Sequence, residues 1–136
     1  MRNILWKHKK DGLLDWLIKV FYNTTPDDSE VILKELDDID CEPEAFYKAA
    51  EILESGVWNT GFTYTDTDKH VTFVTINETD SAKEFLNTLA HEVTHIAMHI
   101  GEFYKLNYRS EDISYLVGEY YLWNVWFCKR IFMWTL

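Results

Sequence analysis

The segment from residue 81 to residue 101 constrains the fold most, because it joins helix boundary signals to a regular apolar repeat. Ser81 and Glu84 have the spacing of a capping box, and Gly101 is a typical helix stop. Between them, apolar residues recur at intervals of three and four, as in an amphipathic helix with one face in a core. These residues are Phe85, Leu86, Leu89, Val93, Ile96 and Ile100. We therefore expect one long helix in this segment.

The same segment contains the sequence His91-Glu92-Val93-Thr94-His95. Residues four apart lie on one face of a helix, about 6 Å apart along its axis, so both imidazoles can bind one tetrahedral Zn²⁺. Glu92 lies about 100° around the helix from His91, where a carboxylate can act as a general base. The motif H-E-x-x-H thus predicts that His91 and His95 are zinc ligands and that Glu92 is catalytic. The alternative is a pair of ordinary histidines on an amphipathic helix.

A catalytic zinc site needs a third protein ligand, with water in the fourth position. His99 lies one more turn along the helix, but one straight helix cannot bend three turns, about 12 Å of axis, around a single ion. The metzincin spacing fails, because Met98 and Gly101 stand where that motif has its Gly and its last His. Glu111 and Glu119, both in the last predicted helix, remain as candidates.

The chain after the motif follows the pattern Glu-x-Ile-Ser-x-x-x-Gly, in residues Glu111, Ile113, Ser114 and Gly118. Together with H-E-x-x-H, this pattern resembles that of the gluzincins, the thermolysin-like metallopeptidases. The resemblance implies that His91, His95 and Glu111 bind the zinc and that Glu92 is the general base. It also implies a zincin-like fold and a peptide or protein substrate.

This chain departs from the thermolysin-like pattern four residues after the ligand glutamate, where the family has an aspartate and this sequence has Tyr115. Tyr115 shares a helix face with Glu111, so we expect its hydroxyl to reach a zinc ligand or to stabilise an oxyanion. The alternative places it in the core. Tyr108 and His99 are the other candidate oxyanion donors. Gly118 indicates close packing of the last helix against the motif helix.

Residues 57–119 also resemble short zincin-like proteins of gut bacteria and their phages, through stretches similar to residues 61–64 and 84–88 and through the Tyr-Leu-x-Gly that begins at Tyr115. This resemblance implies no established activity. Two classes of function therefore stay open, a zinc metallopeptidase and a non-catalytic interaction protein with a zincin fold. Glu92 favours the peptidase, because a structural site needs no base. The lack of room for the second domain of full-length gluzincins favours the interaction protein.

The remaining patterns predict an α+β fold, with residues 1–136 as one minimal zincin-like domain. We expect three further helices, at residues 11–21, 31–36 and 43–56. Strands are predicted at residues 60–65 and 70–76, with a weaker one at residues 3–8. These strands would form a small antiparallel sheet packed on the helices, including the motif helix and an aromatic-rich C-terminal helix. The zincin resemblance implies that residues 71–74 form the edge strand beside the cleft, and the alternative is that this hairpin only covers the core.

Charge and composition exclude several partners. The net charge is −10, and residues 27–54 hold 11 of the 23 acidic residues against Lys34 and Lys48, so nucleic acid is not an expected partner. The longest uncharged run of the C-terminal segment, residues 120–128, is too short to span a membrane. That aromatic segment is either core or a surface for self-association or docking to a larger assembly. Two cysteines and no N-terminal apolar signal segment fit a cytoplasmic protein, or a virion-associated one if the chain is phage-encoded.

Overall fold

The computed structural model describes residues 2–8, 16–107 and 111–132, and the side chains of residues 16–107 and 111–126. Four strands form one sheet in the order β1-β2-β4-β3, with bounds β1 Arg2–His8, β2 Trp16–Thr24, β3 Gly61–Asp66 and β4 Val71–Asn77. The helices are a short 3-10 helix η1 Pro26–Asp28, α1 Ser29–Asp38, α2 Pro43–Ser55, α3 Ala82–Phe103 and α4 Glu111–Phe132.

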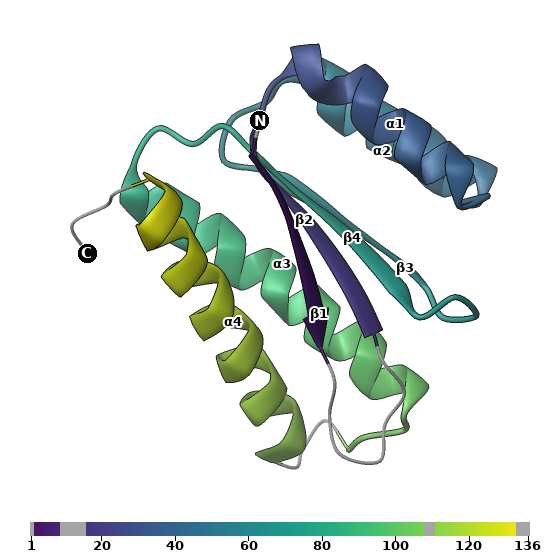
Figure 1. Cartoon of the computed structure of the whole chain (residues 1–136), viewed down its shortest axis with the longest axis vertical. Helices are drawn as coiled ribbons and strands as arrows, with labels where there is room; N and C mark the ends of the chain where they lie inside the picture. Colours follow the sequence, from purple (N-terminus) through teal and green to yellow (C-terminus); the bar gives the residue numbers. More distant parts are fainter. Residues whose placement is uncertain (1, 9–15, 108–110, 133–136) are drawn as a thin grey trace.

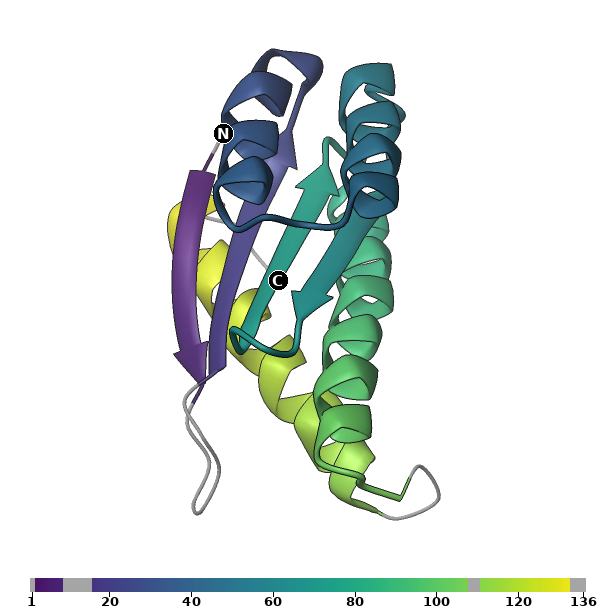
Figure 2. The ribbon, with the colours of Figure 1, turned by 90° about the vertical axis from the view of Figure 1, so that its right-hand side faces the viewer.

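The sheet lies between two helical layers (Figures 1 and 2). α3 and α4 cover one face, and α1 and α2 cover the other. The α+β class is thereby confirmed. The sheet is mixed rather than wholly antiparallel, because β2 and β4 run parallel while β1–β2 and β3–β4 are antiparallel. A parallel pair needs a long crossover, which η1, α1, α2 and β3 supply between β2 and β4.

The helix predicted for residues 11–21 is wrong in its described part, because β2 begins at Trp16. β2 is an inner strand, paired to β1 on one side and β4 on the other. Both of its faces are covered, with Ile18 and Val20 packed under α3 and α4 and Phe21 packed under α1 and α2. A strand buried on both faces does not show the alternation of apolar and polar residues that marks a half-exposed strand. The apolar residues of this segment therefore have a spacing that also fits a helix.

The other predicted elements are confirmed, with small shifts at their ends. α2 begins at Pro43 and ends before Gly56, which adopts the left-handed conformation (φ 64°) of a helix stop. The hairpin of β3 and β4 and the strand β1 form where they were expected. The prediction of residues 71–74 as an edge strand is wrong, because β4 is paired on both sides. β3 is an edge strand of the sheet, and α3 packs along it.

α3 begins as predicted, since the Ser81 hydroxyl accepts a hydrogen bond from the Glu84 N–H at 3.1 Å. It does not stop at Gly101 but continues to Phe103. Gly101 is buried, and a Cβ there would collide with Cδ1 of Ile113 in α4. The close approach predicted at Gly118 therefore occurs at Gly101, whereas a Cβ at Gly118 would have no atom of the described residues within 4 Å.

α4 is buried along one face only. Leu116 and Tyr120 lie in the core, and the Tyr22 hydroxyl donates a hydrogen bond to Asn124. On the other side, Leu122 is 66% exposed and Trp126 is 53% exposed. Within the described ranges, no helix is long and apolar enough to cross a membrane.

The two glycines of the α3–α4 pair should respond differently to alanine. Gly118→Ala should stabilise the protein by about 0.5–1 kcal/mol, because alanine in an open helical position costs less conformational entropy than glycine. Gly101→Ala should be less favourable than Gly118→Ala by about 1 kcal/mol, because its Cβ would displace Cδ1 of Ile113. Urea unfolding measures both. Ile113→Val removes the colliding Cδ1, so it should recover part of that difference. Equal effects of the two alanines would contradict this packing.

Candidate metal centre

His91 and His95 lie together on the exposed side of α3, because the apolar stripe of this helix faces the sheet and α4. Their Nε2 atoms are 3.2 Å apart, with the ring centroids at 4.8 Å. Two ligands of one tetrahedral zinc, each at 2.0–2.1 Å from the metal, stand about 3.3 Å apart. The side chains thus already have the mutual spacing that one zinc ion requires of two imidazoles.

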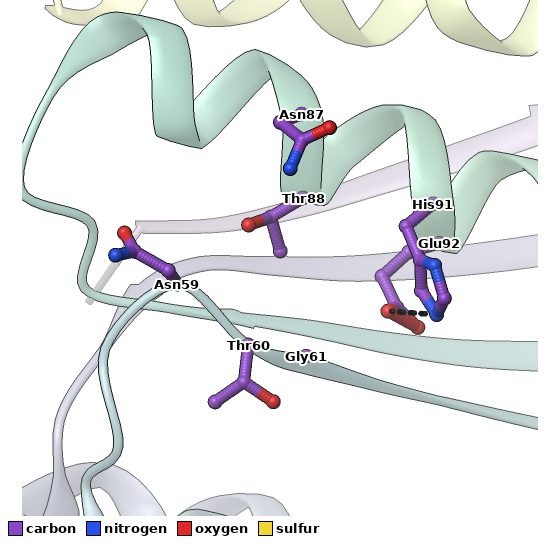
Figure 3. A pocket seen from close by; sticks show the side chains of 7 residues that line it. All are labelled: Asn59, Thr60, Gly61, Asn87, Thr88, His91 and Glu92. Atoms are coloured by element: carbon purple, nitrogen blue, oxygen red, sulfur yellow. Dashed lines mark ion pairs between the residues drawn. The ribbon is translucent and has the colours of Figure 1, made fainter.

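Glu92 lies beside His91 but is buried in the space between α3 and β3 (Figure 3). Its side chain is only 5% exposed, whereas the His91 side chain is 70% exposed. The Thr63 hydroxyl of β3 donates a hydrogen bond to Glu92 Oε1 at 2.8 Å, and Glu92 Oε2 lies 3.9 Å from His91 Nε2. A Cβ at Gly61 would stand 3.0 Å from Glu92 Cγ and 2.5 Å from the Thr75 carbonyl oxygen. Gly61 therefore makes room for this carboxylate.

A polar pocket of about 240 Å³ opens between the start of β3 and α3 (Figure 3). The side chains from α3 and those from the β3 segment line opposite walls, and the ion pair of His91 with Glu92 lies at one end. The lining residues are Asn59, Thr60, Gly61, Asn87, Thr88, His91 and Glu92. The pocket thus gives a polar ligand access to the histidine and the carboxylate together.

His99 lies one turn beyond His95, with ring centroids 6.0 Å apart. Its Nδ1 is 2.9 Å from the Thr65 hydroxyl of β3. Burial lowers the pKa of His99, and a positive charge on His95 lowers it further, whereas Glu102 opposes this shift. A second pocket of about 370 Å³ adjoins this ring, lined by Thr65, Thr67, His99, Glu102 and Phe103.

The other predicted site residues do not join this group. Glu111 is exposed in the first turn of α4. This end of α4 contacts α3 at Gly101, through Ile113. Gly101 lies six residues, or about 9 Å of helix, beyond His95. Tyr115 is 70% exposed and lines neither pocket. No three His, Cys, Asp or Glu side chains of the described residues lie together as a metal-binding group.

Three site features have no counterpart in the predicted roles. Thr63 and Thr65 of β3 contact Glu92 and His99, and Gly61 makes space for Glu92. These residues precede the motif by about thirty positions, so no helical spacing connects them to it. Residues 61–64 did appear in the resemblance to short zincin-like proteins, and alternate residues of a strand share one face. These two features of the sequence could have indicated that Gly61, Thr63 and Thr65 share one face of a strand near the motif.

Tyr108 lies outside the described residues, so the structure does not place this candidate donor. No protein-family model matches the chain, and neither the curated proteins nor the solved structures show a match to it. The site must therefore be interpreted from its own geometry.

The hydrogen bond of Thr63 to Glu92 should contribute to stability, because a buried carboxylate that loses its donor is left unsatisfied. We expect Thr63→Val to lower the free energy of unfolding by about 1–3 kcal/mol. Thr60→Val is the matched control, since Thr60 lines the same pocket without a side-chain hydrogen bond among the described residues, and should change stability by less than about 0.5 kcal/mol. Chemical unfolding of the metal-free variants decides this, and equal effects would contradict the contact.

His99 should make stability depend on pH. Its folded-state pKa is lowered, so between that value and the unfolded value near 6.5 the unfolded chain binds more protons. The contribution is therefore intact above about pH 6.5 and is lost as the pH falls below it. Unfolding in EDTA at about pH 7.5 and pH 5.5 should show a smaller loss for His99→Gln than for wild type. An identical loss would show that His99 titrates alike in both states.

Proposed function

We propose that this protein is a zinc-dependent metallopeptidase, with His91 and His95 as metal ligands and Glu92 as general base. The observation that carries the proposal is the pair of Nε2 atoms 3.2 Å apart beside a buried carboxylate. Two nitrogen donors at this spacing fit Zn²⁺. Glu111 is the third ligand that the gluzincin resemblance implies, and Glu119 is the alternative, although no third His, Cys, Asp or Glu lies beside the two histidines among the described residues.

The burial of Glu92 supports a cation at this position. A carboxylate on a side chain that is 5% exposed, with Thr63 as its hydrogen-bond donor among the described residues, is costly unless positive charge lies close to it. His91 is the only charged-group partner of Glu92 in the described part of the chain, and it becomes positive only when protonated. A divalent ion held by the two histidines would offset the buried charge at any pH at which it binds.

The residues around Glu92 fit a base that is held in place. Bound zinc would polarise a carbonyl group and make a water molecule more acidic. Thr63 fixes Oε1 of Glu92, which leaves Oε2, on the side of His91, to take a proton from that water and pass it to the leaving amine. Because Gly61 lacks a side chain, the carboxylate can lie directly under the strand.

β3 offers a place for an extended peptide. It is an edge strand of the sheet, with β1 at the opposite edge, and the Asn77 N–H donates to the Thr60 carbonyl at 2.9 Å. In a regular antiparallel ladder, the backbone groups of Gly61, Thr63 and Thr65 then face away from β4. A substrate strand added to this edge would lie beside the histidines of α3. We propose β3, in place of β4, as the substrate-pairing strand.

A non-catalytic interaction protein is the second candidate. The observation in its favour is an exposed apolar surface on α4, formed by Leu122, Trp123 and Trp126. Such a surface is typical of a docking site. An interaction protein requires no third metal ligand, but it gives no functional role to the hydrogen bond between Thr63 and Glu92.

Metal analysis of purified variants tests the ligands. Wild type should retain about one zinc per chain after dialysis, and His91→Ala and His95→Ala should each retain almost none, because a site with one imidazole fewer binds weakly. Glu111→Ala tests the third ligand that the gluzincin resemblance implies, with Glu119→Ala as its matched control on the same helix, and loss of the metal in Glu111→Ala alone would support that role. Loss in Glu119→Ala alone would transfer the third position to Glu119. If the wild-type protein stays free of metal after incubation with excess zinc, the proposed site is wrong.

Glu92→Gln separates catalysis from binding. The amide keeps the shape of the side chain and can accept the Thr63 hydrogen bond, but it cannot take a proton. We expect unchanged zinc content and folding with a loss of about 10²–10⁴ in the rate of peptide hydrolysis. Cleavage of a broad peptide library, followed by mass spectrometry, provides the assay. If zinc-loaded wild type cleaves no peptide, the interaction protein becomes the better account.

A further inference from the structure

A line of hydrogen bonds crosses the interior from β2 to α3 and ends at His99. Trp16 Nε1 donates to Thr72 Oγ1 at 2.9 Å, Thr72 Oγ1 is 2.9 Å from Thr65 Oγ1, and Thr65 Oγ1 is 2.9 Å from His99 Nδ1. Trp16 and Thr72 are almost fully buried, at 1% and 0% exposure. These four side chains come from β2, β4, β3 and α3, so the fold itself holds the line together.

The direction of the line follows from the chemistry of its first member. An indole N–H can only donate, so Thr72 accepts from Trp16. Thr72 has one proton to donate, and Thr65 is its only other side-chain partner among the described residues. A buried hydroxyl without an acceptor for its proton is an unsatisfied donor, which is unfavourable, so Thr72 donates to Thr65. Thr65 in turn has His99 Nδ1 as the acceptor for its own proton.

We propose that this line holds His99 as the Nε2–H tautomer, and that His99 is a hydrogen-bond donor to a carbonyl oxygen of a peptide bound along β3. Nδ1 accepts from Thr65, so the ring proton of a neutral imidazole must be on Nε2. His99 then donates rather than ligates, and Thr65 is its positioning residue. The peptide as ligand rests on the proposed function, whereas the tautomer does not.

The surroundings of His99 indicate what it would bind. The ring borders the pocket of about 370 Å³, whose other lining residues come from the last turns of α3 and from the β3–β4 hairpin. The Glu102 carboxylate lines the same pocket and repels an anionic ligand. A neutral carbonyl oxygen is therefore favoured over a carboxylate. The ring of Phe103 and the hydroxyl of Thr67 complete a wall that suits an uncharged peptide segment.

The tautomer can be measured directly on the metal-free protein by long-range ¹H–¹⁵N correlation NMR of the imidazoles. Wild type should show His99 with a protonated Nε2 and an unprotonated Nδ1. Thr65→Val removes the donor to Nδ1 and should turn this into a mixture of tautomers, whereas Thr65→Ser should restore the wild-type pattern. Thr67→Val, in the same pocket wall without a side-chain hydrogen bond among the described residues, should leave it unchanged. A protonated Nδ1 or a tautomer mixture in wild type would overturn the proposal.

Ligand donation has its own readout, which needs neither zinc nor hydrolysis. Acetyl-trialanine amide, added to the metal-free protein, should shift the His99 Nε2–H resonance more than acetate at the same concentration. The shift should be weakened in Thr65→Val and kept in Thr65→Ser. A larger response to acetate, or none to the peptide, would overturn the donor role. Because this test does not involve turnover, a failure of the peptidase proposal would appear separately, as wild type that binds zinc and cleaves no peptide.

Discussion

The packing of α3 against the sheet fixes the rotation of this helix, and the site depends on that rotation. Leu89, Val93 and Ile96 are almost fully buried on the side of β2, β4 and α4. With these positions inward, the geometry of a helix turns Glu92 toward β3 and leaves His91 and His95 on the open side. Rotating the helix by one residue in one direction would bury both imidazoles, and rotating it in the other direction would expose the carboxylate. The core therefore sets the division of roles within the five-residue motif.

The motif thus places its two histidines in contact with solvent and its carboxylate in the protein interior. The histidines are exposed, where imidazoles can exchange a metal with solvent, and Glu92 is buried, where its charge acts strongly on its neighbours. β3 completes the arrangement from the other side, with Thr63 on the carboxylate and Thr65 on His99. One edge strand and one helix thus supply both the proposed chemistry and the proposed contacts of a peptide.

Local signals in the sequence predicted elements well, and non-local packing explains what they missed. Pro43, Gly56 and Ser81 mark helix ends through their own backbone chemistry, and the structure has helix ends there. β2 was taken for a helix because both faces of an inner strand are apolar, and Gly101 for a stop because its actual partner, Ile113, lies in another helix. The spacing of His91 and His95 is local and was readable. The contacts of Thr63 and Gly61 with Glu92 depend on the packing of β3 against α3, which no short-range sequence pattern encodes.

X-ray absorption spectroscopy at the zinc edge tests the central claim most directly, because it counts the imidazoles around the bound metal. The geometry predicts zinc bound to two imidazoles at about 2.0–2.1 Å, with oxygen atoms completing the shell. His95→Ala should then leave at most one imidazole. A shell that contains sulfur, or that shows no imidazole in the wild-type protein, would contradict a zinc centre at His91 and His95.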